Sequence, residues 1–515
     1  MLCRESLPTN HPFVIGCPGG VEERRYGYGV GSGGVSHRLP RQCPCGAWRR
    51  SNDGAVQMTM KSPRYLRSAA VGLAAGAALV VGVQSTSQAQ PLIDVLLETC
   101  LTNPTLLAQR ESLRGSNEAI AQALSEYRPS VAADADIGTR WSQQRGDFDG
   151  SETVNPASVG ITIEQPIYNF GREAGVNAAN FGIDAARANY IGTEQSVLLS
   201  AVTAYMNVVE AEALLAVSIN NENVLRRQLQ ATQDRFEVGE VTRTDVAQAQ
   251  ASVAGAVALV VQNRGQLEDA RAVFVQVVGF PPGDLTQPDV PAGLPVSLEE
   301  SVVLSERNPS VSASEFTALA ATEQIDVVEG TLLPEFSVVG TARQSTNPSE
   351  AIDRQESAEV RLQMRWQIFA GGLLNSQVRQ QRFLANELGI DVDETRRAIV
   401  ADTITAWENL TTARANISSF RSQVSANAIA LEGVQQEALV GTRTVLDVLD
   451  AEQALLDSQS SLIEARVDEV VAAYQLLSQV GLLTAFDLGL DACVYDFGPD
   501  YERARTRWFG TSVND

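Results

Sequence analysis

The sequence predicts a mainly α-helical protein with a small β part, built as two structural repeats of one unit. The first observation is a set of residue pairs that recur about 200 positions apart. Asn103-Pro104 returns as Asn308-Pro309, and Val238-Gly239 returns as Val440-Gly441. The second observation is a shared order of elements: helix, two strands, very long helix, glycine turn, returning helix. Because solenoid repeats span only about 20–50 residues, this period indicates two halves of one chain.

The composition excludes several classes of function. The chain carries 39 basic and 62 acidic residues, a net charge of −23, and such acidity repels nucleic acid. The only lysine is Lys61 and the histidines are His11 and His37, so the chain after residue 89 has neither type. Imidazole bases and Schiff-base lysines are therefore missing from that part. We expect no enzymatic activity, no cofactor, no metal site and no nucleic-acid partner.

The first 89 residues have the features of an export signal. A basic stretch around Lys61 precedes an Ala/Val/Gly/Leu run over 68–83, and Ala89 offers a small residue for cleavage. We therefore expect a signal peptide over 58–89. Residues 1–57 would then be an upstream extension from a misassigned start codon, with Met58 or Met60 as the true start.

The first repeat is expected over residues 90–285. Helical periodicity is followed by alternating strands, and then by a long stretch without proline. In order, the expected elements are a helix over 92–127, strands at about 130–141 and 159–168, a long helix over 172–238 and a return helix over 241–278. A polar loop over 142–156 is expected to join the two strands.

The second repeat is expected over residues 286–490, with the same plan. Its expected elements are strands at about 336–343 and 360–369, a polar loop over 344–357, a long helix over 373–440 and a return helix over 442–480. Residues 491–515 form a C-terminal tail. Its aromatic and charged residues either pack against the outside of the helices or stay without fixed structure.

The strands alternate between apolar and polar residues. Val360, Leu362 and Met364 share one face, while Arg361 and Gln363 share the other. This pattern fits a membrane β-barrel with a wet lumen, and a soluble half-buried hairpin shows the same pattern. Aromatic residues near the strand ends favour the barrel, because they resemble an interfacial belt. These aromatic residues are Trp141, Tyr168, Phe170, Trp366 and Phe369.

The expected number of strands requires more than one copy of the chain. Four strands per chain are too few to close a barrel, because the smallest membrane barrels have about eight. Open strand edges are not tolerated in lipid. A homotrimer would supply a 12-stranded transmembrane β-barrel in contact with outer-membrane lipid.

The long helices point to a tube rather than a globular domain. At about 1.5 Å per residue, each stretch without proline would form a helix of roughly 100 Å. We expect tip turns at Gly239 and Gly441, after which each return helix runs back. Small residues along these helices favour a hollow α-helical barrel.

Two cysteines remain after the expected cleavage, Cys100 and Cys493, near the two ends of the mature chain. In an oxidising compartment an isolated pair is a candidate disulfide. The alternative is two unrelated buried thiols.

Four motifs resemble the outer-membrane efflux factor family, the TolC-like channels. They are Tyr168-Asn-Phe-Gly171, Phe369-Ala-Gly-Gly372, Arg235-Phe-Glu-Val-Gly239 and Val440-Gly-Thr-Arg-Thr-Val-Leu-Asp-Val-Leu-Asp-Ala451. The resemblance covers about residues 91–490. It implies a trimeric exit duct in the outer membrane, extending into the periplasm. Such a duct docks onto an inner-membrane transporter through a periplasmic adaptor, for efflux or type I secretion, and passively conducts drugs or proteins.

The resemblance also implies a gate at the periplasmic entrance. Asp447 and Asp450, at i and i+3 on one helix face, match the family's cation-binding carboxylate ring, where crowding would raise their pKa values. Arg443 matches the family's gate arginine, with Asp245 as the expected partner. The alternative is that each acid is an ordinary solvated or helix-capping residue. Ala438 stands where the family has an aromatic gate residue, so one latch is missing.

A second class of function remains open from the residues alone. A periplasmic coiled-coil scaffold or adaptor without a pore would account for the long helices and the acidity. It would not account for four amphipathic strands placed symmetrically in the two repeats.

Overall fold

The computed structural model describes residues 90–145 and 150–513. The chain divides into two units, residues 1–81 and 82–515, and the described residues all belong to the second. The expected upstream extension and signal peptide, residues 1–57 and 58–89, lie outside the described residues.

The helix expected over 92–127 is two helices, because the repeated Asn-Pro pair interrupts it. Helix α1 covers Leu92–Thr102 and α2 covers Pro104–Ser125. The Asn103 side chain accepts hydrogen bonds from the backbone N–H groups at the start of α2, and Pro104 occupies its first turn. The Asn103 side chain also donates to the carbonyl of Val277 (2.8 Å). Its repeat mate Asn308 donates in the same way to Gln479 (2.9 Å).

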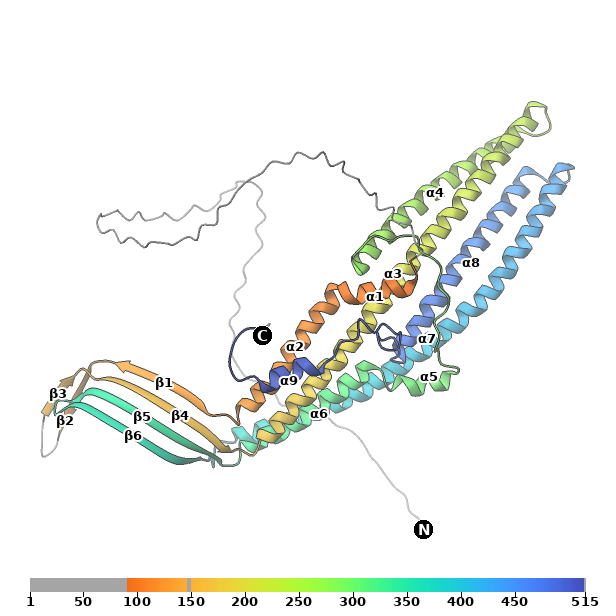
Figure 1. The fold of residues 1–515 in the computed structure, drawn as a ribbon. Helices are drawn as coiled ribbons and strands as arrows, with labels where there is room; N and C mark the ends of the chain where they lie inside the picture. The colour runs from red at the N-terminus through yellow and green to blue at the C-terminus, as the bar shows by residue number, and fades with distance from the viewer. Residues whose placement is uncertain (1–89, 146–149, 514–515) are drawn as a thin grey trace, which may run out of the picture. The chain divides into compact units, whose positions relative to one another are not determined.

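Two helical hairpins dominate the structure (Figure 1). They are α3 (Arg172–Glu237) with α4 (Arg243–Val278), and α7 (Leu373–Leu439) with α8 (Val445–Gln479). The 66 residues of α3 span about 100 Å at 1.5 Å per residue. By length and composition α3 and α4 could each cross a membrane. This test does not identify a span, since core helices of soluble proteins also pass it.

One four-stranded antiparallel sheet combines strands from both halves of the chain. Its order is β1 (Ser130–Ile137), β4 (Ala157–Tyr168), β5 (Glu335–Ser349) and β6 (Ile352–Arg365). The pairing of β4 with β5 joins the two halves. Because each strand leads directly to or from a long helix, the sheet lies at the end opposite the hairpin tips (Figure 1).

Both polar loops expected between strands are largely β-structure instead. Strands β2 (Arg140–Gln144) and β3 (Gly150–Val154) pair as a separate hairpin within the first expected loop, and Trp141 lies in it. Strands β5 and β6 run through the second expected loop as far as the pairing of Ser349 with Ile352, and β6 ends at Arg365 rather than near 369. The polar composition of these segments does not distinguish loops from strands, because strands exposed to water on both faces also carry polar side chains.

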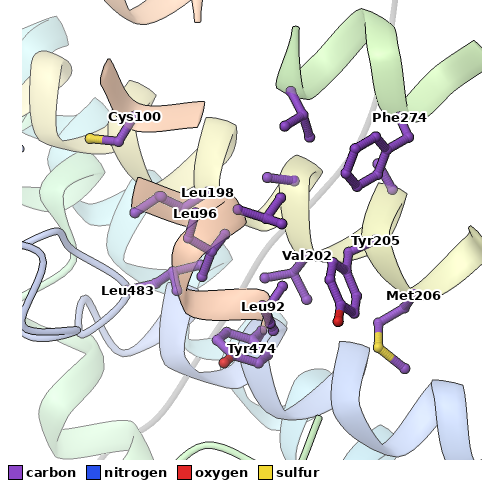
Figure 2. Packing of buried hydrophobic residues seen from close by; sticks show 14 of the residues in the cluster. Leu92, Leu96, Cys100, Leu198, Val202, Tyr205, Met206, Phe274, Tyr474 and Leu483 are labelled. Atoms are coloured by element: carbon purple, nitrogen blue, oxygen red, sulfur yellow. The ribbon is translucent and has the colours of Figure 1, made fainter. Parts of the chain in front are cut away.

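The remaining described helices are α5 (Leu298–Ser305), α6 (Pro309–Gly330) and α9 (Gly498–Thr506). The main hydrophobic core joins α1, α3, α4, α8 and the segment after α8 (Figure 2). Tyr205 is fully buried there, and its hydroxyl oxygen lies 2.8 Å from the Gln90 carbonyl and 2.7 Å from the Thr286 carbonyl. The hydroxyl has one hydrogen, which it can donate to either carbonyl, and it accepts a hydrogen bond from the Thr286 N–H (3.1 Å), so Tyr205 links the segments at residues 90 and 286 to α3.

The C-terminal tail packs on α2 and α3 and is in contact with the segment just after α2 as far as Trp508. Ala504 of α9 is buried with Ile120 and Ile183. Arg114 pairs with Asp500 at 3.0 Å, and the Tyr501 hydroxyl donates to Asn180 at 2.9 Å.

Candidate functional site

The apolar face of the four-stranded sheet is uncovered within the chain. Ile161 pairs with Ala342, and Ala342 pairs with Ala358, so these residues share one face. On that face Ile137 is 86% exposed, Val360 79% and Leu362 72%. Contiguous exposed apolar surface of this kind marks contact with a partner or a membrane. Its large members are Val131, Ile137, Val159, Ile161, Ile163, Val360, Leu362 and Met364.

The opposite face of the sheet carries a charge network. Arg343 on β5 contacts Asp134 (3.1 Å) and Asp136 (2.7 Å) on β1, and also the hydroxyl of Ser158 on β4. The arginine reaches across β4 because Gly160 lies between; a Cβ there would approach the Asp134 carboxylate to 3.0 Å. One face is therefore apolar and the other ionic, as expected for a sheet between lipid and water.

The two edges of this sheet are unpaired among residues 90–145 and 150–513. Strands β1 and β6 each have a single neighbour. In lipid, free edges are costly because no water satisfies their N–H and C=O groups. The 14 residues of β6 extend about 46 Å, or about 35 Å along the normal at a tilt of ~40°. The apolar part of the face on β6 runs from Ala358 to Met364, because Arg354 and Glu356 lie on the same face nearer the β5–β6 turn.

A close backbone crossing joins the sheet to the helices. A Cβ on Gly330, at the end of α6, would lie 2.5 Å from the backbone nitrogen of Gly171. A Cβ on Gly171 would lie 2.7 Å from the carbonyl oxygen of Val327. Only glycine fits at both positions. This crossing explains the glycine that follows Tyr168-Asn-Phe in the sequence.

Both hairpin tips are built in the same way. Gly239 and Gly441 each have φ of +82°, the left-handed conformation that ends a helix with glycine. Each return helix then begins with a capping box. Thr444 N–H donates to Asp447 (2.8 Å) and Asp447 N–H donates to the Thr444 hydroxyl (3.2 Å). Asp245 is held in the same way by its own capping threonine.

The two aspartates of the expected ring have different surroundings in one chain. Hydrogen bonds from the Thr444 backbone and then its hydroxyl lower the pKa of Asp447. This direction is opposite to the one expected from crowding, which needs further copies. Asp450 is exposed and lines a groove of about 500 Å³ between α3, α4 and α8, with Leu225 and Ser252. The T-x-x-D spacing before an apolar run was the sequence signal for the cap.

The expected contact between Arg443 and Asp245 is not made within a single chain. The Arg443 guanidinium pairs with Glu437, Nε to Oε2 at 2.9 Å, and this partner raises the Arg443 pKa. Sequence reasoning missed Glu437, which lies on the other arm of the same hairpin. Ala438, at the position of the missing aromatic latch, is buried against Leu431 of α7 and Val448 of α8.

A second groove, of about 640 Å³, lies between α3 and the α7–α8 hairpin. Arg227 and Glu452 line it. Glu452 accepts a hydrogen bond from Gln435 at 3.1 Å, and burial raises the Glu452 pKa. No group of three or more His, Cys, Asp or Glu residues suited to a metal ion occurs within the described ranges.

The two cysteines after residue 89 form a disulfide in the structure. Cys100 of α1 is bonded to Cys493 of the tail, with Cα atoms 6.1 Å apart. Both are buried in the main core, where Figure 2 shows Cys100. The bond fixes the tail to the first helix, across 393 positions of sequence.

Known proteins resemble this chain in sequence and in fold. The family model described as outer membrane efflux protein matches residues 95–279 and 302–482. The outer membrane efflux protein BepC of Brucella suis biovar 1 (strain 1330) is 32% identical, over 86% of this chain and 97% of that protein. The outer membrane protein TolC of Escherichia coli (strain K12) is 25% identical, over 79% and 85%.

A solved structure gives the same result for the fold. The outer-membrane channel OprN matches with a TM-score of 0.67 at 19% identity, covering 76% of this chain and 90% of that chain. The family match covers both halves of the chain, and its members are channels of the outer membrane. This chain belongs to the outer membrane efflux protein family and is a TolC-like protein of the bacterial outer membrane.

Proposed function

We propose that the chain forms the trimeric outer-membrane exit duct of a tripartite efflux or type I secretion system, passively conducting drugs or proteins. The observation that carries the proposal is the four-stranded sheet with one apolar face, one ionic face and two free edges. A scaffold without a pore would leave that apolar face in water. Insertion in lipid would remove the apolar face from water. Pairing with other copies would supply hydrogen-bond partners to the backbone N–H and C=O groups of the free edges.

Three copies account for both the edges and an exposed helix surface. Three sheets of four strands give a barrel of twelve, within the range of bacterial barrels. Helix α7 exposes Phe383, Ile390 and Ile429 along its length, with no cover in its own chain. Neighbouring copies would bury these side chains in the wall of an α-helical barrel. The homotrimer is therefore favoured by two separate surfaces.

The long helices set the direction of the duct. With the sheet in the outer membrane, α3 would run about 100 Å from the sheet and place the hairpin tips in the periplasm. The tips would meet a periplasmic adaptor and an inner-membrane transporter. The two grooves of about 640 and 500 Å³ near the tips give an adaptor shallow sites between the hairpins.

The gate is proposed at the tips. Asp447 and Asp450 from three copies would place carboxylates around the entrance, favouring cations and repelling anions. Crowding in that ring would oppose the capping hydrogen bonds that lower the Asp447 pKa. We further propose that Arg443 exchanges Glu437 for Asp245 when the tips close. Asp245 carries no ion pair within the described residues, and its hydrogen bonds from Thr242 go to one carboxylate oxygen, Oδ2.

Single-channel conductance in a planar bilayer tests the duct and its gate together. Small cation-selective openings are expected from the purified protein. Asp447→Ala with Asp450→Ala should reduce both the cation selectivity and the block by divalent cations. A matched control, Asp391→Ala with Asp393→Ala, removes the same charge from α7 far from the tips and should leave divalent block unchanged. Absence of conductance from a folded trimer would contradict the proposal.

A further inference from the structure

The C-terminal tail is held rigidly along the helices. The disulfide between Cys100 and Cys493 fixes its start. The Arg110 guanidinium then lies 4.7 Å from the centre of the Tyr495 ring, and Arg114 pairs with Asp500. A segment attached at this many points presents its end in a defined place.

That end lies at the base of the sheet. Arg128 donates to the carbonyl of Arg507 (3.1 Å) and to the carbonyl of Arg505 (3.2 Å). The Arg128 guanidinium also lies 4.5 Å from the centre of the Trp508 ring. Since Ser130 begins β1, two residues after Arg128, Trp508 lies beside the point where the chain enters the sheet.

The chemistry of this end differs from the rest of the protein. Trp508 is 59% exposed and Phe509 is 87% exposed. Residues 503–509 include three arginines and no acid, in a chain of net charge −23. Two of the arginines also pair with acids just before this segment, Arg503 with Asp500 (3.0 Å) and Arg505 with Glu502 (3.5 Å). Tyr168 and Trp366 lie at the same base of the sheet, where β4 ends and β6 has just ended, and both are half-exposed. The tail therefore extends an existing row of aromatic residues.

We propose that residues 503–509 dock on the phospholipid headgroups of the periplasmic leaflet, with a preference for anionic lipid. Tryptophan favours the membrane–water interface, where its apolar ring and its N–H group both find suitable surroundings. Arginine binds phosphate oxygens, and basic residues beside a membrane surface are attracted to anionic headgroups. The inference rests on the proposed function, because it requires the sheet to be inserted.

Tryptophan fluorescence in lipid nanodiscs tests this docking. The chain has five tryptophans, so single-tryptophan variants are made by replacing the other four with phenylalanine. The full chain retaining Trp508 is compared with one retaining Trp366, which reports insertion of the sheet. A third retains Trp407, in the middle of α7, which is partly buried against a helical core cluster and serves as the control away from the sheet. The quencher is a phospholipid with a nitroxide on its headgroup, in discs with or without phosphatidylglycerol.

The expected result is quenching of Trp508 at least two-fold stronger than that of Trp407, and stronger with phosphatidylglycerol than without it. Replacing Arg503, Arg505 and Arg507 with glutamine should weaken the quenching at least two-fold. Strong quenching of Trp366 with none of Trp508 beyond the Trp407 level would overturn the docking and leave the duct standing. Absence of quenching at Trp366 would overturn both.

Discussion

Alanine at position 330 would separate two backbones that touch only because both residues are glycine. The added Cβ would lie 2.5 Å from the nitrogen and 2.8 Å from the Cα of Gly171, closer than real Cβ contacts. Overpacking typically costs about 1–3 kcal/mol. Both partners here are backbone, so we take the upper end, about 3 kcal/mol. Alanine has a higher helix propensity than glycine, which offsets about 1 kcal/mol of that cost. We expect Gly330→Ala to lower the free energy of unfolding by about 2 kcal/mol.

The matched control is Gly389→Ala, in the interior of α7. No atom lies within 4 Å of a Cβ at that position. The same substitution should therefore stabilise the protein, by up to about 1 kcal/mol. Thermal unfolding is followed by circular dichroism in one detergent and at one protein concentration, because assembly makes the midpoint concentration-dependent. A Gly330→Ala midpoint equal to or above that of Gly389→Ala would refute the crossing as the reason for glycine.

Three further predictions follow from other contacts. Replacing both Cys100 and Cys493 with alanine should lower the free energy of unfolding by about 2–5 kcal/mol, which is measured as a lower thermal midpoint. Reductant should lower the midpoint of the wild type but not that of the variant. Asp447 has a folded pKa below its unfolded value of about 3.9. Its stabilisation is therefore present above that pH and is lost as pH falls through the folded pKa. The protection of the amides at the start of α8, taken relative to intrinsic hydrogen exchange at each pH, should fall below about pH 4, and Asp447→Asn should remove this fall; a wild-type protection that stays constant with pH would contradict it. Arg343→Gln leaves two aspartates unneutralised on the ionic face of the sheet. The reversal potential in a salt gradient should then shift towards higher cation selectivity, and an unchanged potential would place Arg343 away from the conducting path.

Local sequence rules predicted the parts of the fold that depend on short-range physics. A long run without proline, followed by glycine, is typical of one uninterrupted helix with a left-handed end, and Gly239 and Gly441 both have φ of +82°. Alternation of Val360, Arg361 and Leu362 predicted which side chains share a face, because successive strand residues point to opposite sides.

Other features depend on contacts that no local pattern records. The crossing of Gly171 and Gly330 joins residues far apart in sequence, so neither glycine differs locally from one in a flexible turn. The capping role of Asp245 and Asp447 is different, because the threonine three positions before each aspartate is a local signal. The partner of Arg443 could not be predicted either, because several acids lie near the tip and packing selects Glu437.

Cysteine cross-linking can show whether the free edges of the sheet pair between three copies. Ala133→Cys on β1 is combined in turn with one cysteine at each of residues 356–364 on β6, and the protein is oxidised in detergent. If the edges pair between three copies, at least one of these cysteine pairs yields a covalent product of three chains and nothing larger. A folded protein that gives only single chains at all of these positions would contradict it.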